Sequence, residues 1–222
     1  MQWFNKNVKS SLEVTEIPAA DEQRAQTTPC FNSSQNKDNI LVVFHHLQRA
    51  CENKLITVEY CQTMAAYNQW MNERLYNVCD SISDSERKQD LGAFFGSIHN
   101  TLNHIMLGDL AFMSRFSGTP ETVPELAVNL YDDFTQLRHA REALDNRITD
   151  WSATVTDDWL RQQLTYKSKV DGGDITAPHW VLLTHMFNHE THHRGQITTL
   201  LNQLGHDMGT TDIPFMDRYR PA

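Results

Sequence analysis

The stretch PHWVLLTHMFNHETHHRGQITTLLNQLG, residues 178–205, has the apolar period of one long amphipathic helix. A proline suits the first turn of a helix and a glycine often follows the last turn, so we expect limits at Pro178 and about Leu204. With 100° of rotation per residue, the apolar side chains gather in one narrow arc that should be buried. That arc contains Leu182, Met186, Ile197, Leu200 and Leu204.

The same helix carries a group of histidines, and their angular positions separate them. His193 falls inside the apolar arc and His189 on its margin, whereas His185 and His192 lie farther round the helix. His189 and His193 are four residues apart, the spacing at which a helix offers two imidazoles to one metal ion. A hydrogen-bonded pair at a helix edge is an open alternative. Glu190 does not fit the H-E-x-x-H pattern, so a zinc protease is not indicated.

Three further segments have a helical apolar period, at residues 58–79, 87–116 and 128–150. The stretch LTYKSKVDGGDITAP, residues 164–178, instead alternates and contains two adjacent glycines, which predicts a hairpin-like excursion before the last helix. Four long amphipathic segments joined by loops predict an all-α fold, a four-helix bundle.

The segment 87–116 can supply a third inward histidine. His104 lies near small residues, among them Gly108 and Ala111, which would let a neighbouring helix approach closely. Three neutral imidazoles on two helices would hold a divalent ion and leave coordination positions open for water or substrate. Zinc, nickel, iron and copper all accept imidazole, so the residues alone do not select the metal.

Other polar residues of these helices are interpreted as structural or supporting. We expect Asp109 and Arg115 to pair within the bundle or to cap a helix. Gln196 and Arg194 could orient a histidine ligand through hydrogen bonds, although Arg194 fits a solvent-exposed position equally well. A metal-dependent hydrolase would need a nearby carboxylate base, and the helical period places neither Asp109 nor Glu190 well for that role.

Charge and composition argue against several classes of protein. The net charge of −9 and the lack of a basic stripe disfavour nucleic-acid binding. No apolar run approaches the roughly 20 residues that cross a bilayer, and the N-terminus lacks a secretory pattern. We therefore expect a cytoplasmic protein without membrane contact. The cysteines form no C-x-x-C pair, which disfavours a zinc ribbon or a disulfide framework.

Residues 1–54 differ from the rest of the chain. The stretch AADEQRAQTTPCFNSSQNKDN, residues 19–39, is polar and without period, which predicts a poorly structured N-terminal extension. The helical-bundle domain is expected at residues 55–222. Because the helical period begins abruptly at LITVEY, residues 55–60, we also hypothesise that the first 54 residues come from an over-long gene assignment. The mass of the protein from its native host would test this.

Two motifs carry a resemblance to a known family: LNHIMLGDLAFMSRFSG, residues 102–118, and LLTHMFNHETHHRGQITTLLNQLG, residues 182–205. From about Leu55 to the C-terminus, the chain resembles the DinB-like proteins, bacterial damage-inducible helical bundles of the DinB and YfiT type. The resemblance implies a four-helix bundle, a homodimer, and a divalent metal ion held by three histidines. These match His104, His189 and His193, in agreement with the helical projection.

The resemblance implies less about the reaction. Family relatives include thiol transferases that use bacillithiol or mycothiol, and a maleylpyruvate isomerase that depends on a low-molecular-weight thiol. We therefore expect zinc or nickel first, then iron or another divalent ion, and the transfer of a small-molecule thiol to a small electrophile in stress or detoxification. Two alternatives stay open: a non-enzymatic, damage-inducible metal-binding stress protein, and a metal-dependent hydrolase.

Overall fold

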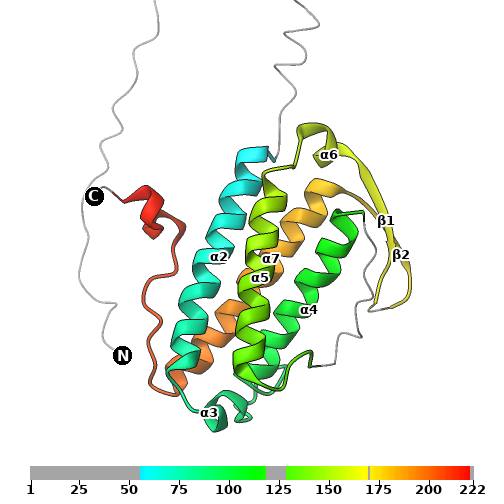
Figure 1. Cartoon of the computed structure of the whole chain (residues 1–222). Coiled ribbons are helices and arrows are strands. Elements are labelled where there is room, and N and C mark those ends of the chain that lie inside the picture. The colour runs from blue at the N-terminus through cyan, green and yellow to red at the C-terminus, as the bar shows by residue number, and fades with distance from the viewer. Residues whose placement is uncertain (1–55, 119–128, 170, 221–222) are drawn as a thin grey trace, which may run out of the picture. The chain divides into compact units, whose positions relative to one another are not determined.

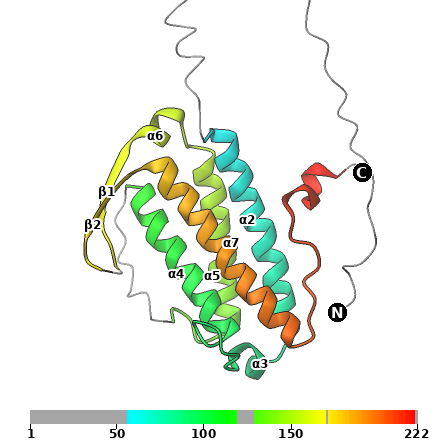
Figure 2. The same ribbon diagram turned by 180° about the vertical axis from the view of Figure 1, so that it is seen from behind.

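The computed structural model describes residues 56–118, 129–169 and 171–220. The predicted N-terminal extension, residues 1–54, lies outside these ranges. Within them, the long helices are α2 (Val58–Asp80), α4 (Ile98–Phe116), α5 (Phe134–Ser152) and α7 (His179–Gln203). Figures 1 and 2 show the four helices side by side, and α2 packs mainly on α5 while α4 packs mainly on α7. The predicted all-α bundle is confirmed.

The helix limits follow from local capping. The Thr57 hydroxyl accepts a hydrogen bond from the Tyr60 amide at 3.1 Å and so begins α2. Pro178 lies immediately before the first residue of α7. Backbone amides at the start of a helix have no partner within the helix, so a proline there loses no hydrogen bond. The predicted limits of these two helices agree with the observed ones to within two residues.

The prediction of one helix over residues 87–116 is wrong in its first third. The chain instead forms the short helix α3 (Asp84–Lys88), then a loop over residues 89–97, and only then α4. Gly92 and Gly96 have φ values of 74° and 78°, a left-handed conformation that no right-handed helix contains. The Ser97 hydroxyl then caps α4 by accepting from the Asn100 amide at 3.1 Å.

The helix predicted over residues 128–150 also begins later than expected. Residue 128 lies outside the described ranges, and α5 begins at Phe134. The carboxylate of Asp133 accepts a hydrogen bond from the Gln136 amide at 2.8 Å, which stabilises the start of the helix at that position. The apolar period of the sequence did not reveal this cap.

A hairpin precedes α7, as predicted. After the short helix α6 (Asp157–Arg161), strand β1 (Gln163–Lys167) pairs antiparallel with β2 (Asp174–Pro178). The hairpin runs alongside α4 at the edge of the bundle (Figure 1). Two short 3-10 helices, Ile213–Phe215 and Asp217–Tyr219, follow α7. In the described ranges, no helix has both the length and the apolar character that crossing a membrane requires.

The core lies between the four long helices. Each helix contributes a fully buried leucine, namely Leu75, Leu107, Leu137 and Leu183. Cys61 and Cys79 are buried free thiols in the same core. Charged side chains are buried there as well, and their pairing is described with the site below.

Candidate metal centre

Three histidines from α4 and α7 converge on one point of the bundle. The Nε2 atom of His189 lies 3.0 Å from Nε2 of His104 and 3.1 Å from Nε2 of His193. Two nitrogens that each lie about 2.0 to 2.1 Å from one tetrahedral zinc ion are separated by about 3.3 Å. All three ligand atoms lie within 4.8 Å of one another. The three side chains are therefore positioned to hold a metal ion.

Helix packing brings the three residues together. His189 and His193 lie one turn apart on α7, and His104 faces them from α4. A Cβ atom at Gly108 would lie only 2.8 Å from Cε1 of His189 and 3.2 Å from its Nδ1. The glycine therefore provides the space that the His189 ring occupies, and the expected close approach at this small residue is confirmed.

The environment of the histidines favours their neutral form. Burial, together with the nearby His193 and His104, lowers the pKa of His189 to about 3. Burial also lowers the pKa of His193. Because imidazole binds a metal only when it is deprotonated, protons compete weakly with a metal ion here.

Gln196 orients one of the rings. Its Oε1 atom lies 2.8 Å from Nδ1 of His193, so the amide accepts a hydrogen bond from this nitrogen when the proton resides there. In that tautomer the Nε2 lone pair of His193 faces His189 and His104. The orienting role expected of Gln196 agrees with this geometry.

The loop over residues 89–97 closes one side of the histidine cluster. The Phe95 ring stacks on His104 with 4.0 Å between ring centroids and meets His193 edge-on at 5.5 Å. Phe95 therefore covers the histidines with an apolar surface that keeps water away. This contact was not predicted, because the apolar period placed Phe95 inside a continuous helix.

A cavity of about 360 Å³ lies beside His104 and His189. This volume falls within the range of small-molecule sites, which is about 300 to 1,000 Å³. One wall is a face of α4 and the other is the β1–β2 hairpin. The two walls contribute Gly108, Ala111, Phe112, Arg115, Tyr166, Ser168, Lys169 and Ile175. The histidine cluster is therefore accessible from this side.

His185 and His192 of α7 stand outside the cluster, as the helical projection predicted. Both His185 and His192 are exposed. The ring centroid of His185 lies 6.0 Å from that of His189, and His185 also lines the cavity.

A network of buried charges lies on the inner side of the same helices. The guanidinium of Arg141 on α5 donates to Asp109 Oδ2 of α4 at 2.5 Å and lies 2.8 Å from Asp145 Oδ1. All three side chains are at least 95% buried. The predicted pairing of Asp109 within the bundle is confirmed. Burial raises the pKa of Asp145 to about 6, and it raises that of Asp109 well above its usual range.

The network continues through α7 to α2. Glu190 pairs with Arg194, and Asn68 of α2 donates to Glu190 Oε1 at 2.7 Å. Glu190 is completely buried and Arg194 is 3% exposed, so the solvent-exposed alternative for Arg194 is wrong. Because Glu190 and Arg194 directly follow His189 and His193, the network also fixes the rotation of α7 that turns both histidines toward α4.

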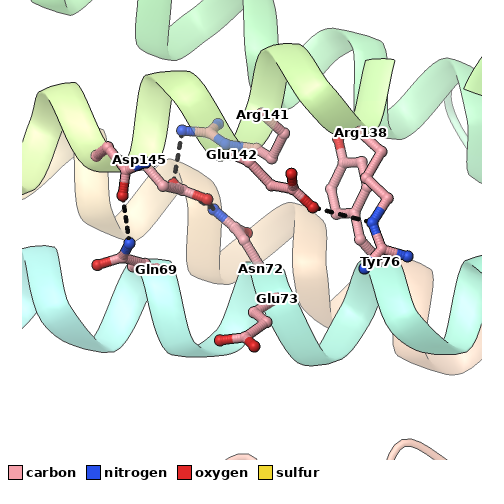
Figure 3. A pocket seen from close by; sticks show the side chains of 9 residues that line it. Gln69, Asn72, Glu73, Tyr76, Arg138, Arg141, Glu142 and Asp145 are labelled. Carbon is pink, nitrogen blue, oxygen red and sulfur yellow. Dashed lines mark hydrogen bonds and ion pairs between the residues drawn. The ribbon is translucent and has the colours of Figure 1, made fainter. Parts of the chain in front are cut away.

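A second, polar pocket of about 230 Å³ opens onto this network between α2 and α5. Figure 3 shows Asp145, Arg141 and Asn72 at its floor, with Arg138 and Glu142 paired near its rim. The Asn72 amide donates to Asp145 at 3.0 Å. The charges at the floor are thus already satisfied mainly by one another.

Comparisons with known proteins match most of the described chain. The DinB family model matches residues 52–220, a range that contains the three histidines and the buried network. Over 154 residues, the chain is 27% identical to Protein DinB of Bacillus subtilis (strain 168), and the alignment covers 66% of this chain and 87% of that protein.

Proposed function

The chain belongs to the DinB family, and from that premise we propose that it is a metal-dependent enzyme that transfers a low-molecular-weight thiol to a small electrophile. His104, His189 and His193 would hold the divalent ion, with zinc and nickel as the first candidates. The observation that carries the proposal is the convergence of three imidazole nitrogens beside an accessible cavity. A role in stress or detoxification and a homodimeric state belong to the same proposal.

The cavity favours an enzyme over a protein in which the metal only ties two helices together. Structural zinc sites are closed by four protein ligands, whereas catalytic sites keep a position open. In the part of the chain that the structure describes, the cluster supplies three ligand residues, and two of them line the cavity. A hydrolase receives no comparable support, because Asp109 and Glu190 are completely buried and neither lines the cavity.

A divalent ion in this site would supply Lewis acidity, which lowers the pKa of a thiol or water molecule that reaches it. The protein's own residues would orient and shield the reactants: Gln196 fixes the His193 ring, Phe95 excludes water on one side, and the cavity walls hold the electrophile. In the transfer, the thiol sulfur forms a bond to the electrophilic carbon. The leaving group departs with the electron pair of the broken bond, and the thiol proton passes to water.

The test is a conjugation assay with the full-length protein after addition of zinc or nickel. Bacillithiol, mycothiol and glutathione are each offered with 1-chloro-2,4-dinitrobenzene. We expect one thiol to react faster than in buffer, a loss of this acceleration in His104→Ala, and its retention in the matched variant His192→Ala. An absence of acceleration with every thiol, or equal rates for wild type and His104→Ala, would contradict the proposal.

A further inference from the structure

One cation in the cavity beside the histidines, Arg115, has no counter-ion among the residues that the structure describes. Arg115 of α4 lines the cavity and is half-buried. Within the described ranges, it forms neither an ion pair nor a hydrogen bond, contrary to the pairing or capping role expected from the sequence. Burial lowers its pKa, although the nearby Tyr166 partly offsets this effect. Even this partial burial removes some of the solvation of the guanidinium, which a bound anion would offset.

Aromatic rings hold the Arg115 guanidinium in place. Its central carbon lies 4.2 Å from the Tyr166 ring centroid and 5.1 Å from that of Phe112. A guanidinium that stacks on aromatic faces keeps its N–H groups at the rim, where they can form two parallel hydrogen bonds to a carboxylate. Arg115 is thus preorganised to bind a planar anion.

The charges around the cavity have one sign. Its lining contains two cationic side chains, Arg115 and the exposed Lys169, and no aspartate or glutamate among the described residues. Lys169 has a partner of its own, so Arg115 is the cation that the cavity offers to a ligand. The remaining walls are largely apolar, with Ala111, Phe112 and Ile175 among them. The surface therefore complements a molecule with an apolar body and an anionic end.

We propose that the cavity takes a small apolar molecule with a carboxylate at one end, and that Arg115 binds this carboxylate while the rest of the molecule points toward the histidines. The inference rests on the proposed function only in treating the cavity as the substrate site of the metal centre. Arg115 follows His104 by eleven residues, which is about 16 Å along a helix. Because helical side chains tilt toward the N-terminus, the Arg115 guanidinium lies nearer to His104 than the rise along the helix alone gives.

The hairpin gives this assignment a structural basis. Tyr166, which stacks on Arg115, and Ile175 both come from the β1–β2 hairpin rather than from the four long helices. The bundle thus supplies the histidines, whereas the hairpin completes the surface that would select the substrate.

The test compares two probes with the same apolar body, 4-phenylbutyrate and its neutral amide 4-phenylbutyramide. Their dissociation constants are measured by calorimetry on the full-length, zinc-loaded protein. We expect wild type to bind the carboxylate about 10-fold more tightly than the amide or better, because a hydrogen-bonded charge is worth at least that factor. Arg115→Gln should remove the preference, and Arg115→Lys should keep part of it. Arg161→Gln, at an exposed site outside the cavity, is the matched control and should bind as wild type does.

A repeat with the metal-free protein separates Arg115 from direct coordination of the probe by zinc. The preference should persist there, because Arg115 remains. The assignment is overturned if wild type shows no preference or no binding, if Arg115→Gln retains the preference, or if chelation abolishes it. If the thiol-conjugation assay fails while the preference depends on Arg115, the proposed reaction is wrong and the carboxylate site stands.

Discussion

Two polar clusters share α7, and neighbouring residues of the helix belong to different clusters. His189 and His193 face His104 of α4, and His189 lines the accessible cavity, whereas Glu190 and Arg194 are buried against α2 and α5. In the histidine cluster, neutral nitrogens converge on one another, an arrangement that a cation would stabilise. In the buried network, carboxylates and guanidiniums neutralise one another. The buried network therefore orients α7, whereas the histidine cluster can bind a ligand.

The largest expected effect comes from breaking the buried network. Arg141→Leu leaves Asp109 and Asp145 without their buried guanidinium and should lower the free energy of unfolding by about 3 to 5 kcal/mol. Urea denaturation followed by circular dichroism measures this loss. Arg138→Leu, on the same helix but with a partly exposed guanidinium, should cost about 1 kcal/mol or less. Equal losses in the two variants would show that the network contributes no special stability.

The next expected effect is a loss of metal affinity rather than of stability. Gly108→Ala places a methyl group where the His189 ring lies, so the ring must move and metal affinity should fall by about 10- to 100-fold. Competition with a chromogenic chelator measures the affinity. Gly195→Ala is the matched control on α7, because an added Cβ meets nothing within 4 Å. Metal affinities equal to that of wild type in both variants would contradict the role assigned to Gly108.

A third expected effect is a difference in the response to pH. In metal-free protein, the unfolded chain protonates His189 near pH 6.5, while the folded protein resists protonation down to about pH 3. This residue therefore makes folding less stable as pH falls from about 6.5 toward 3. Asp145 acts with the opposite sign, because its folded pKa of about 6 is above its ordinary value.

His189→Leu tests the histidine contribution to that response. Unfolding free energies measured between pH 7 and 4 in the presence of a chelator should fall less steeply for His189→Leu than for wild type. Parallel curves would mean that the histidine cluster does not disfavour protonation in the folded state.

The sequence predicted the apolar architecture and the histidine cluster well, for one physical reason. The helical period places side chains by angle, so it identified α2 and α7 and separated His189 and His193 from His185 and His192. The helical period did not predict burial where the partner of a side chain lies far away in the sequence. Arg194 is buried because Glu190 and Asn68 satisfy it, and Asn68 lies 126 residues earlier in the chain.

The loop before α4 illustrates a second limit. Its apolar residues continue the period of the following helix, yet Gly92 and Gly96 adopt left-handed conformations and Ser97 begins a new helix. Capping and positive φ depend on a few atoms and leave little trace in an apolar period. The contact of Phe95 with His104 was therefore not predictable from the pattern alone.

The most direct test of the central claim is the metal content of three proteins, purified in parallel and measured by plasma emission spectroscopy. Wild type should carry roughly one divalent ion per chain. His193→Ala should lose it, whereas His192→Ala, the exposed neighbour on the same helix, should keep it. Equal metal content in wild type and His193→Ala, or equal loss in the two variants, would contradict the assignment of the site to His104, His189 and His193.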